Sequence, residues 1–405
     1  MDISFYICAE KNVKMEYIAR QIEQYIEENL SIFPAVVVLG SRQCGKSTLI
    51  KKMAERKGDM LYLDLQNRND LAKLNEPTLF FRNNEDKTIC LDEVQLSPDI
   101  FSVLRSEIDF HRVPGRFILL GSASRNLIQK TSESLAGRIG LIDLTPFIVS
   151  ELDKDPNYSY TKYWFRGGYP DSYGAESDNA SSLWRENFIR TYIERDIPQL
   201  GFQIAAPQLM RLLTMTAHEQ GQLLNASKFA SSMDLSAPTI RHYFDIMEQT
   251  YIIRTLQPYY HNTKKRLVKS PKIYIRDSGL LHQILMISSF NDLLSHPVMG
   301  YSWEGMVIEN VCTVARHAQC SFYRSATGDE MDLVLQYPDR LIAIECKAST
   351  APSVTEGFWK SIEFLNPTQT YVVAPIESSY PLAENVDVCN LSEIMKIVSD
   401  IENNI

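Results

Sequence analysis

Residues 35–48 read AVVVLGSRQCGKST, and this stretch decides the fold of the first third of the chain. The run 35–40 is continuously apolar apart from its final glycine, which is typical of a strand buried in a parallel sheet. The letters from Gly40 to Ser47 fit the pattern G-x-x-x-x-G-K-[ST], and a helix is expected from Thr48. A strand, a glycine-containing loop and a helix in this order predict a phosphate-binding loop.

This predicted loop has the chemistry that a nucleotide with β- and γ-phosphates requires. Its glycines let backbone N–H groups wrap around the phosphates, and the N-terminus of the next helix points at the anion. Lys46 is expected to reach the β- and γ-phosphates, and Ser47 is expected to ligate Mg²⁺.

A second strand carries two acidic residues at its end. KTICLDEVQ (87–95) is an apolar run that finishes with Asp92 and Glu93. Asp92 suits an outer-sphere Mg²⁺ carboxylate, and Glu93 suits a base that orients the attacking water. RFILLGSAS (116–124) is another buried strand, and its polar end at Ser122 is expected beside the γ-phosphate.

Two more apolar runs, DMLYLDL (59–65) and GLIDLTP (140–146), bring the number of expected strands to five. Helical stretches separate these strands. The pattern predicts a parallel α/β sheet that binds its ligand at the carboxyl ends of the strands.

Composition sets the wider limits. The chain has 405 residues, 44% of them hydrophobic and 22% charged, which suits two or three globular domains. A formal charge of −9 argues against a protein that coats nucleic acid with its whole surface. Seven cysteines without a CxxC pair indicate reduced thiols and a cytoplasmic setting. No stretch approaches the roughly 20 apolar residues of a membrane span, so we expect no membrane partner.

The middle of the chain predicts a connector followed by a winged helix. Residues 153–205 mix loop signals with helical periodicity. In 223–259, one helix precedes a turn, and Ser236 caps a second helix that has Pro238 in its first turn. Two short apolar strands then supply a wing.

Seven Lys or Arg residues and no acid lie between Arg254 and Arg276. In an acidic chain this excess predicts contact with the DNA phosphate backbone, while a hinge between packed protein parts stays open as the alternative. The expected nucleic-acid contacts are Arg241, Lys264, Lys265, Arg266, Lys269 and Lys272.

The last third contains an alternating hairpin, GDEMDLVLQ (328–336) and LIAIECK (341–347), joined by YPDR. Its register places Asp332 opposite Glu345. Like charges across a ladder destabilise it unless a cation lies between them, and oxygen ligands suit Mg²⁺ or Mn²⁺. Lys347 shares the face of Glu345 and could stabilise developing phosphate charge.

A third carboxylate, Glu304, lies on the apolar side of the helix expected at 303–315 and so needs a partner. The alternative is that these residues form simple ion pairs without a metal. The expected metal ligands are Ser47 and Asp92 in the first site and Glu304, Asp332 and Glu345 in the second. The expected catalytic residues are Lys46, Glu93, Asp332, Glu345 and Lys347.

Several segments together resemble a known family. They are GSRQCGKST (40–48), LDEVQ (91–95), SLAGRIGLIDLTPFIVSEL (134–152), RGGYP (166–170), YIERDI (192–197) and WEGMVIEN (303–310). They are similar to prokaryotic AAA-type (STAND-related) ATPases with a C-terminal domain of unknown function. The order of a helix Glu, a strand Asp and Glu-x-Lys resembles the PD-(D/E)XK nuclease superfamily. The resemblance implies an ATPase core that uses ATP and Mg²⁺, a winged-helix middle and a nuclease-like end.

In AAA-type ATPases a subunit often donates an arginine to the nucleotide of its neighbour. Arg138 is the candidate here, ahead of Arg125 and Arg195, and a surface ion pair is the alternative for Arg138. The expected ATP-binding residues are Gly40, Ser41, Arg42, Gln43, Cys44, Gly45, Lys46, Ser47, Thr48, Ser122 and Arg138.

We therefore expect an α/β protein with four parts. They are a P-loop ATPase domain (1–152), a helical connector or lid (153–205), a winged helix (206–280) and a PD-(D/E)XK nuclease-like α/β domain (281–405). Two functions stay open: an ATPase that binds DNA and couples nucleotide state to a metal-dependent nuclease-like domain, or an ATP-dependent switch or docking module without nuclease activity. A homo-oligomer is conceivable, and a monomer or dimer is equally open.

Overall fold

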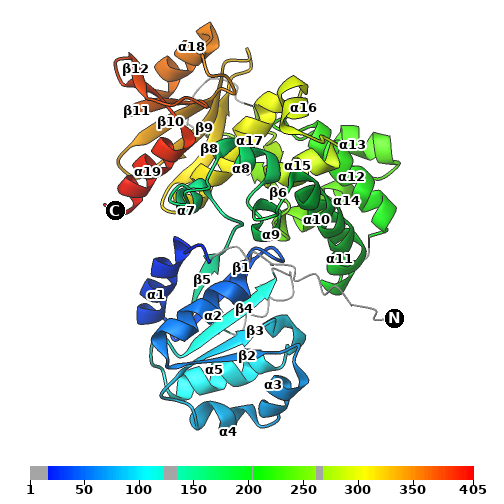
Figure 1. Cartoon of the computed structure of the whole chain (residues 1–405), viewed down its shortest axis with the longest axis vertical. Coiled ribbons are helices and arrows are strands. Elements are labelled where there is room, and N and C mark those ends of the chain that lie inside the picture. The colour runs from blue at the N-terminus through cyan, green and yellow to red at the C-terminus, as the bar shows by residue number, and fades with distance from the viewer. Residues whose placement is uncertain (1–16, 123–134, 203, 261–267) are drawn as a thin grey trace, which may run out of the picture.

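The computed structural model describes residues 17–122, 135–202, 204–260 and 268–405. They form two lobes, which Figure 1 shows one above the other. We call residues 17–146 the first lobe and residues 147–405 the second lobe. The chain passes from one lobe to the other just after the last strand of the first sheet.

A five-stranded sheet forms the centre of the first lobe. Every paired strand in it is parallel, and the order is β2-β3-β4-β1-β5. The five strands expected from the apolar runs are confirmed. They are β1 (Ala35–Gly40), β2 (Met60–Asp64), β3 (Thr88–Asp92), β4 (Phe117–Ser122) and β5 (Ile139–Asp143).

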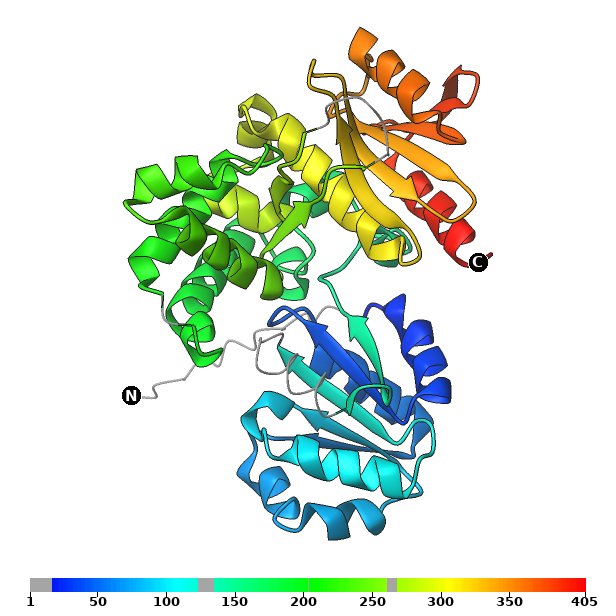
Figure 2. The same cartoon turned by 180° about the vertical axis from the view of Figure 1, so that it is seen from behind.

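Helices cover both faces of this sheet, as Figure 2 shows from behind. Alternate residues of β1 point to opposite faces, so Val36 packs with Ile50 of α2 and Val37 packs with Leu104 of α5. The helices are α1 (Ile22–Ile32), α2 (Lys46–Lys57), α3 (Arg68–Lys73), α4 (Pro77–Arg82), the short 3₁₀ turn η1 (Val94–Leu96) and α5 (Ile100–Phe110).

The second lobe begins with a helical part that also contains two antiparallel strands, β6 (Ile253–Leu256) and β7 (Lys272–Ile275). Ser236 caps α14 as predicted, because its Oγ accepts a hydrogen bond from the Thr239 N–H. The helices are α7 (Val149–Leu152), α8 (Tyr160–Arg166), α9 (Pro170–Tyr173), α10 (Asp178–Thr191), the π-helix η2 (Tyr192–Asp196), α11 (Ile197–Gln199), α12 (Ala206–His218), α13 (Ala226–Met233), α14 (Ala237–Gln249), α15 (Ser278–Ile284) and α16 (Phe290–Ser295).

A six-stranded mixed sheet of order β12-β13-β11-β10-β9-β8 completes the second lobe. The predicted hairpin register is confirmed as far as its last recorded pair, Ile344 with Leu333. The strands are β8 (Gln319–Arg324), β9 (Glu330–Gln336), β10 (Leu341–Cys346), β11 (Gln369–Val373), β12 (Tyr380–Ala383) and β13 (Val386–Cys389), and the helices are α17 (Met299–Val314), α18 (Glu356–Leu365) and α19 (Leu391–Glu402).

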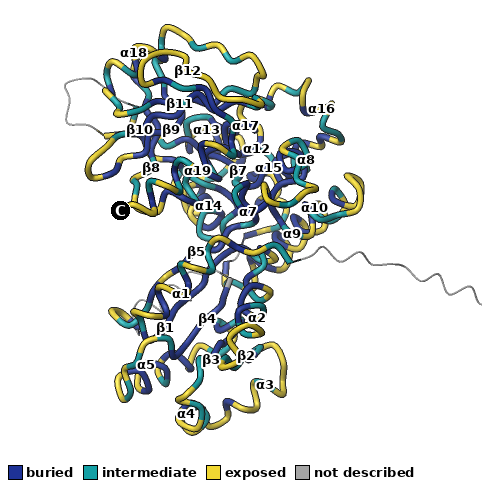
Figure 3. The backbone as a smooth tube through the Cα atoms, turned by 60° about the vertical axis from the view of Figure 1, so that its left-hand side comes forward, coloured by how far each residue is buried: buried dark blue, intermediate teal, exposed yellow. Residues whose placement is uncertain are grey.

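One hydrophobic core runs through the whole second lobe. It joins Phe147 and α7 to the helical part, to α17 and to one face of the six-stranded sheet. Figure 3 shows the buried backbone continuing between these parts. The boundary expected at 152 therefore lies inside this core, and the one expected at 280 falls within α15. The segment after β6 also lies against the sheet, since the Tyr259 N–H donates to the Phe322 carbonyl at 2.6 Å.

Candidate nucleotide site and C-terminal charge cluster

The predicted phosphate-binding loop connects β1 to α2 at the carboxyl edge of the sheet. Gly45 sits at φ +102°, a conformation that side chains disfavour, and immediately precedes α2. A Cβ on Gly40 would lie 2.2 Å from the Leu144 carbonyl oxygen, so only glycine fits there. The residues from Ser41 to Gly45 thus form a tight loop that leads directly into α2, whose first turn contains Lys46, Ser47 and Thr48.

Two cations fix this loop from inside. The Lys46 ammonium is buried and donates to the carbonyls of Gly40 at 3.0 Å and Ser41 at 2.7 Å. The Arg20 guanidinium donates to the Cys44 carbonyl at 3.0 Å. Its Nε also lies 3.0 Å from a Glu151 carboxylate oxygen in α7. Sequence reasoning missed Arg20, because no motif surrounds it and its partners are distant in the chain.

The end of β3 places the predicted carboxylates close to the loop. Asp92 is buried and accepts a hydrogen bond from the Tyr62 hydroxyl and another from the Glu93 N–H at 2.9 Å. Burial, and then the hydrogen bond to Asp92, raise the pKa of Tyr62. Glu93 has φ +53° and is paired with the Gln95 side chain. The backbone of Ser122 lies beside Gly40 in the parallel register.

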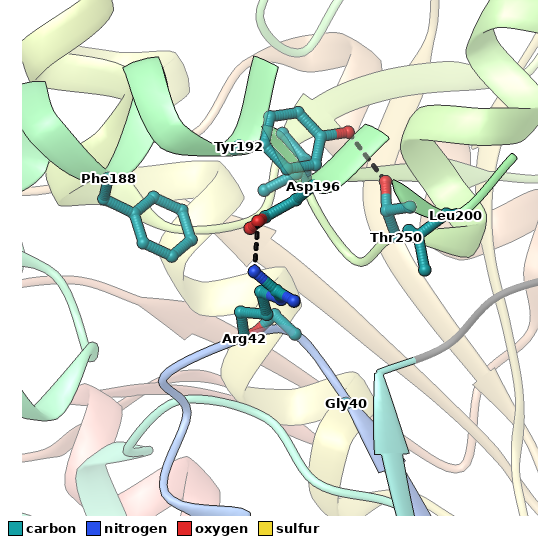
Figure 4. Close-up of a pocket in the computed structure, with 9 residues that line it drawn as sticks. Gly40, Arg42, Phe188, Tyr192, Asp196, Leu200 and Thr250 are labelled. Atoms are coloured by element: carbon teal, nitrogen blue, oxygen red, sulfur yellow. Dashed lines mark hydrogen bonds and ion pairs between the residues drawn. The ribbon is translucent and has the colours of Figure 1, made fainter. Parts of the chain in front are cut away.

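Arg42 points out of the loop toward the second lobe. Its guanidinium pairs with the carboxylate of Asp196 in η2 and donates to the Gln199 amide oxygen at 3.1 Å. Figure 4 shows this pair beside Phe188 and Tyr192 in a pocket that Gly40 also lines.

Burial raises the pKa of Asp196, and the Arg42 cation acts against that shift. The π-helical turn that carries Asp196 is a rare form that frequently marks functional sites.

Arg138 does not lie at this site. It precedes β5 at the amino edge of the sheet, since Ile139 pairs with Ala35 at the start of β1. A five-residue strand separates the two edges by roughly 17 Å. Its guanidinium makes two hydrogen bonds to Asp109, at 2.7 and 2.8 Å. Arg138 is thus remote from the loop of its own chain, and its expected donation to the nucleotide of a neighbouring chain stays a prediction.

In the second lobe the predicted carboxylates come together at the end of the β9–β10 hairpin. The Asp332 carboxylate accepts from the Cys346 N–H at 2.9 Å, and the Lys347 ammonium donates to Glu345 at 2.6 Å. Glu304 projects from α17 into the same region and accepts from the Tyr274 hydroxyl at 2.6 Å. We call Glu304, Glu330, Asp332, Glu345, Lys272 and Lys347 the C-terminal charge cluster.

Charge and burial act together in this cluster. Burial, and next the neighbouring Asp332, raise the pKa values of Glu304 and Glu345. The pKa of Lys272 is raised because nearby carboxylates outweigh its own burial. The cluster thus brings four carboxyl groups together with two ammonium groups, and two of these carboxyl groups keep their protons more readily than usual.

The predicted metal site in this cluster is not formed. The parts of the chain that the structure describes contain no group of three or more His, Cys, Asp or Glu residues arranged to hold a metal ion. The physical reason is Lys272, whose ammonium lies among the carboxylates, 2.8 Å from Glu304 and 3.4 Å from Asp332. The residues present therefore do not fit Mg²⁺ or Mn²⁺ in this arrangement.

The expected nucleic-acid contacts differ in how exposed their side chains are, and three of them are not described by the structure. Arg241 on α14 and Lys269 after the wing loop are exposed, so both are available to a partner. Lys264, Lys265 and Arg266 lie outside the described residues. The prediction for Lys272 is wrong, because its side chain is only 2% exposed and already pairs with carboxylates.

The donor set at the first-lobe loop does fit Mg²⁺–ATP. Backbone glycines, the Lys46 ammonium, the Ser47 hydroxyl and the Asp92 carboxylate are the chemistry that phosphates and a hard cation take. With the all-parallel sheet, this site has the features of a P-loop nucleotide-binding domain. Residues 33–152 match the family described as "AAA domain".

Two further families match the second lobe, both described as domains of unknown function: DUF8612 over residues 157–291 and DUF4143 over residues 299–394. Two proteins described as uncharacterized, Rv2008c of Mycobacterium tuberculosis and Mb2031c of Mycobacterium bovis, are each 35% identical over 362 residues. That alignment covers 89% of this chain and 81% of each relative. The chain belongs to the family of these mycobacterial proteins.

Two solved structures are also similar. AMPPCP-bound DnaA from Aquifex aeolicus is 13% identical, with 56% of this chain and 86% of that chain covered and a TM-score of 0.27. Protein VC1899 from Vibrio cholerae is 11% identical, with 92% and 97% covered and a TM-score of 0.20. Both scores are below 0.5, so neither likeness carries an argument.

None of the helices in the described residues combines the length and the apolar character that crossing a membrane requires.

Proposed function

We propose that this protein is an ATP-dependent switch, in which ATP at the first-lobe loop changes how the second lobe is held and thereby how it docks DNA. The observation that carries the proposal is the pairing of Arg42, inside the phosphate-binding loop, with Asp196 of the second lobe. Because the same loop binds ATP and contacts the second lobe, ATP binding changes the strength of that contact.

The residues of the ATP site have separate tasks. Lys46 and the loop backbone hold the phosphates, Ser47 and Asp92 hold Mg²⁺, and Glu93 orients the attacking water. Mg²⁺, when bound, supplies charge neutralisation at the terminal phosphate. Lys46 now donates to the Gly40 and Ser41 carbonyls, so it must turn from them to reach a phosphate.

The signal starts at Arg42. A phosphate group near this guanidinium offers it a second anion, which competes with Asp196. Because Asp196 is buried, its carboxylate becomes unstable when Arg42 leaves, and η2 must shift or take up a proton. ATP binding therefore loosens η2 and the adjoining α11.

Other contacts between the lobes act on the same loop. Arg20 joins the Cys44 carbonyl to Glu151 of α7, and the Tyr251 hydroxyl donates to Asp143 at the end of β5. Tyr251 follows α14 directly and has φ +62°, so its position depends on the strained start of the wing.

Duplex DNA is the partner we propose for the second lobe. The three helices α12, α13 and α14 followed by β6 and β7 have the element order of a winged helix, and Arg241 is exposed on α14. Arg254 and Arg276 of the basic segment pair with Glu309, and Lys272 pairs with the C-terminal charge cluster. The exposed Lys269 is therefore the described residue of this segment that supports the choice. Nuclease activity is not part of the proposal, because Lys272 lies where the metal was expected.

Hydrogen exchange tests the switch without assuming a partner. Amides of residues 192–200 should exchange at least about fivefold faster when ATP binds the wild-type chain. Asp196→Asn should exchange fast with or without ATP, and Lys46→Ala should show no response to ATP. Glu186→Gln is the matched control, because Glu186 pairs with Arg190 on the exposed side of α10. Unchanged exchange in wild-type protein that has bound ATP would overturn the switch.

Fluorescence anisotropy with a labelled DNA duplex tests the partner. The affinity for DNA should differ at least about fivefold between the ATP-bound and nucleotide-free chain, and Arg241→Ala should weaken both values. Equal affinity in the two states, with the exchange response intact, would leave a switch whose partner is a protein.

A further inference from the structure

Lys272 is a buried lysine of β7 whose ammonium pairs with carboxylates of α17 and β9. It begins β7, the second strand of the β6–β7 pair, yet its ammonium points into the C-terminal charge cluster beside the six-stranded sheet. Its side chain is 2% exposed. A lysine this deeply buried requires carboxylate partners, because an unpaired buried charge is highly unstable.

Carboxylates from two different elements supply those partners. Glu304 of α17 lies 2.8 Å from the Lys272 Nζ, Asp332 of β9 lies 3.4 Å from it, and Glu330 of β9 also pairs with it. An ammonium donates at most three hydrogen bonds, and Lys272 gives one to Glu304 and one to Asp332. Lys272 therefore acts as the shared cation of this cluster.

We propose that the Lys272 ammonium is the resident cation of the C-terminal charge cluster and occupies the place that a divalent metal needs. The wild-type chain then takes no Mg²⁺ or Mn²⁺ there, and removal of the lysine side chain converts the cluster into a divalent-cation site. This proposal is independent of ATP and of the switch.

A second observation points to a cation among these carboxylates. One oxygen of Glu345 is buried and accepts no hydrogen bond, while its other oxygen accepts from Lys347. Asp332 and Glu345 directly follow the last recorded pair of the hairpin, Leu333 with Ile344, so they lie at the same level on neighbouring strands. A divalent ion between them would satisfy the unpaired oxygen, which the lysine does not.

The backbone around Lys272 keeps the lysine in place. On one side it pairs with Leu256 of β6, and on the other it forms a bridge with Leu223. The neighbouring strand residue is held too, since the Ile273 N–H donates to the Gln222 carbonyl at 3.0 Å. Strand contacts on both edges thus fix the backbone from which the side chain extends, and the ion pairs with Glu304 and Asp332 hold the ammonium among the carboxylates.

Metal binding to nucleotide-free protein tests the proposal. Mn²⁺ is titrated into wild-type, Lys272→Ala and Lys272→Arg proteins, and bound ion is measured by electron paramagnetic resonance. Lys272→Ala should bind one additional Mn²⁺ per chain. Its affinity for this ion should be at least about tenfold higher than the affinity of wild type or Lys272→Arg for any Mn²⁺. Lys272→Ala/Asp332→Asn should lose that ion.

Location and folding are checked together. Fe²⁺ with ascorbate should cleave the backbone near residues 304, 332 and 345 in Lys272→Ala and not in wild type. If Lys272→Ala fails to fold, Lys272→Met/Glu330→Gln removes one charge of each sign and carries the same test. Wild-type protein that binds Mn²⁺ and is cleaved at these positions would overturn the proposal, as would a folded lysine-free variant that binds no extra ion.

Discussion

The Arg20 Nε lies 3.0 Å from a carboxylate oxygen of Glu151, and this buried ion pair joins the two lobes at the phosphate-binding loop. The same guanidinium donates to the Cys44 carbonyl within the loop and to the Thr145 carbonyl at 2.7 Å. One side chain thus links the shape of the loop to the place where the chain enters the second lobe.

Arg20→Ala should destabilise the protein by about 3–5 kcal/mol, because it leaves the Glu151 carboxylate buried without its cation. Chemical denaturation measures the change. Arg138→Ala is the matched control: its pair with Asp109 is exposed, and its loss should change stability by less than about 1 kcal/mol. Equal effects from the two variants would contradict the role assigned to Arg20.

The same control variant tests donation between chains. Arg138→Ala should leave ATP turnover per chain within about twofold at dilutions where the protein is monomeric, since Arg138 is remote from its own loop. A turnover defect that grows with protein concentration would instead place Arg138 at the nucleotide of a neighbouring chain.

Two first-lobe substitutions should separate ATP binding from hydrolysis. Lys46→Ala should abolish detectable binding of a fluorescent ATP analogue, because the loop loses its only lysine donor to the phosphates. Glu93→Gln should keep the affinity within about threefold and lower turnover by about 100-fold or more, since the water loses its orienting base. Lys52→Ala on the same helix, whose pair with Glu55 is exposed, should change neither.

Gly167 in the RGGYP segment should not tolerate a side chain. It has φ +78°, and an added Cβ would lie 2.1 Å from the Asp277 carboxylate, which accepts from the Gly168 N–H at 2.8 Å. Gly167→Ala should therefore cost about 3 kcal/mol or more in a denaturation experiment. Gly137 has φ +72° and open space around its Cβ position, so Gly137→Ala should cost only about 1–2 kcal/mol.

His282 should make stability depend on pH. Its Nδ1 lies 3.0 Å from the Phe165 carbonyl, its Nε2 lies 2.7 Å from the Ser302 hydroxyl, and burial lowers its pKa to about 3. Arg185 and His296 lower this pKa further. Below pH 6.5 His282 is protonated in the unfolded chain and stays neutral in the folded chain. It therefore lowers the free energy of unfolding by about 2 kcal/mol at pH 5.

The measurement is the free energy of unfolding between pH 7.5 and pH 5 for wild type and His282→Asn. Burial raises the pKa of Asp277 to about 6, so Asp277 adds stability as the pH falls. Both proteins contain Asp277, so its contribution cancels when one curve is subtracted from the other. Wild type should lose about 2 kcal/mol relative to the variant over this range. Parallel curves would show that His282 takes up its proton in the folded state.

Local signals in the sequence predicted much of this architecture. The strand 35–40, the loop to Ser47 and the hairpin at 328–347 each depend on residues that are neighbours in the chain, so alternation and glycine spacing suffice to find them. Asp332 and Glu345 were placed together because strand register fixes which side chains face each other. Glu304 was added because it lies on the apolar side of a helix and needs a partner.

Partners that are distant in the chain were not predictable in this way. Lys272 sits in a basic segment and reads as an exposed DNA contact, and only the fold reveals that β7 turns it toward α17 and β9. Arg20 and the pairing of Arg42 with Asp196 were missed for the same reason. Charge in a sequence indicates that a partner exists, whereas burial and topology decide which partner it is.

The larger core of the second lobe has a consequence for how the protein is made. The sheet of the first lobe is complete once β5 has been synthesised, but the second-lobe core includes Val398 of α19 and so closes only after roughly 260 more residues. At ordinary rates of translation this takes on the order of 10–50 s. Throughout that interval the nascent helices present unburied apolar faces, which makes this half of the chain the natural client of a chaperone at the ribosome.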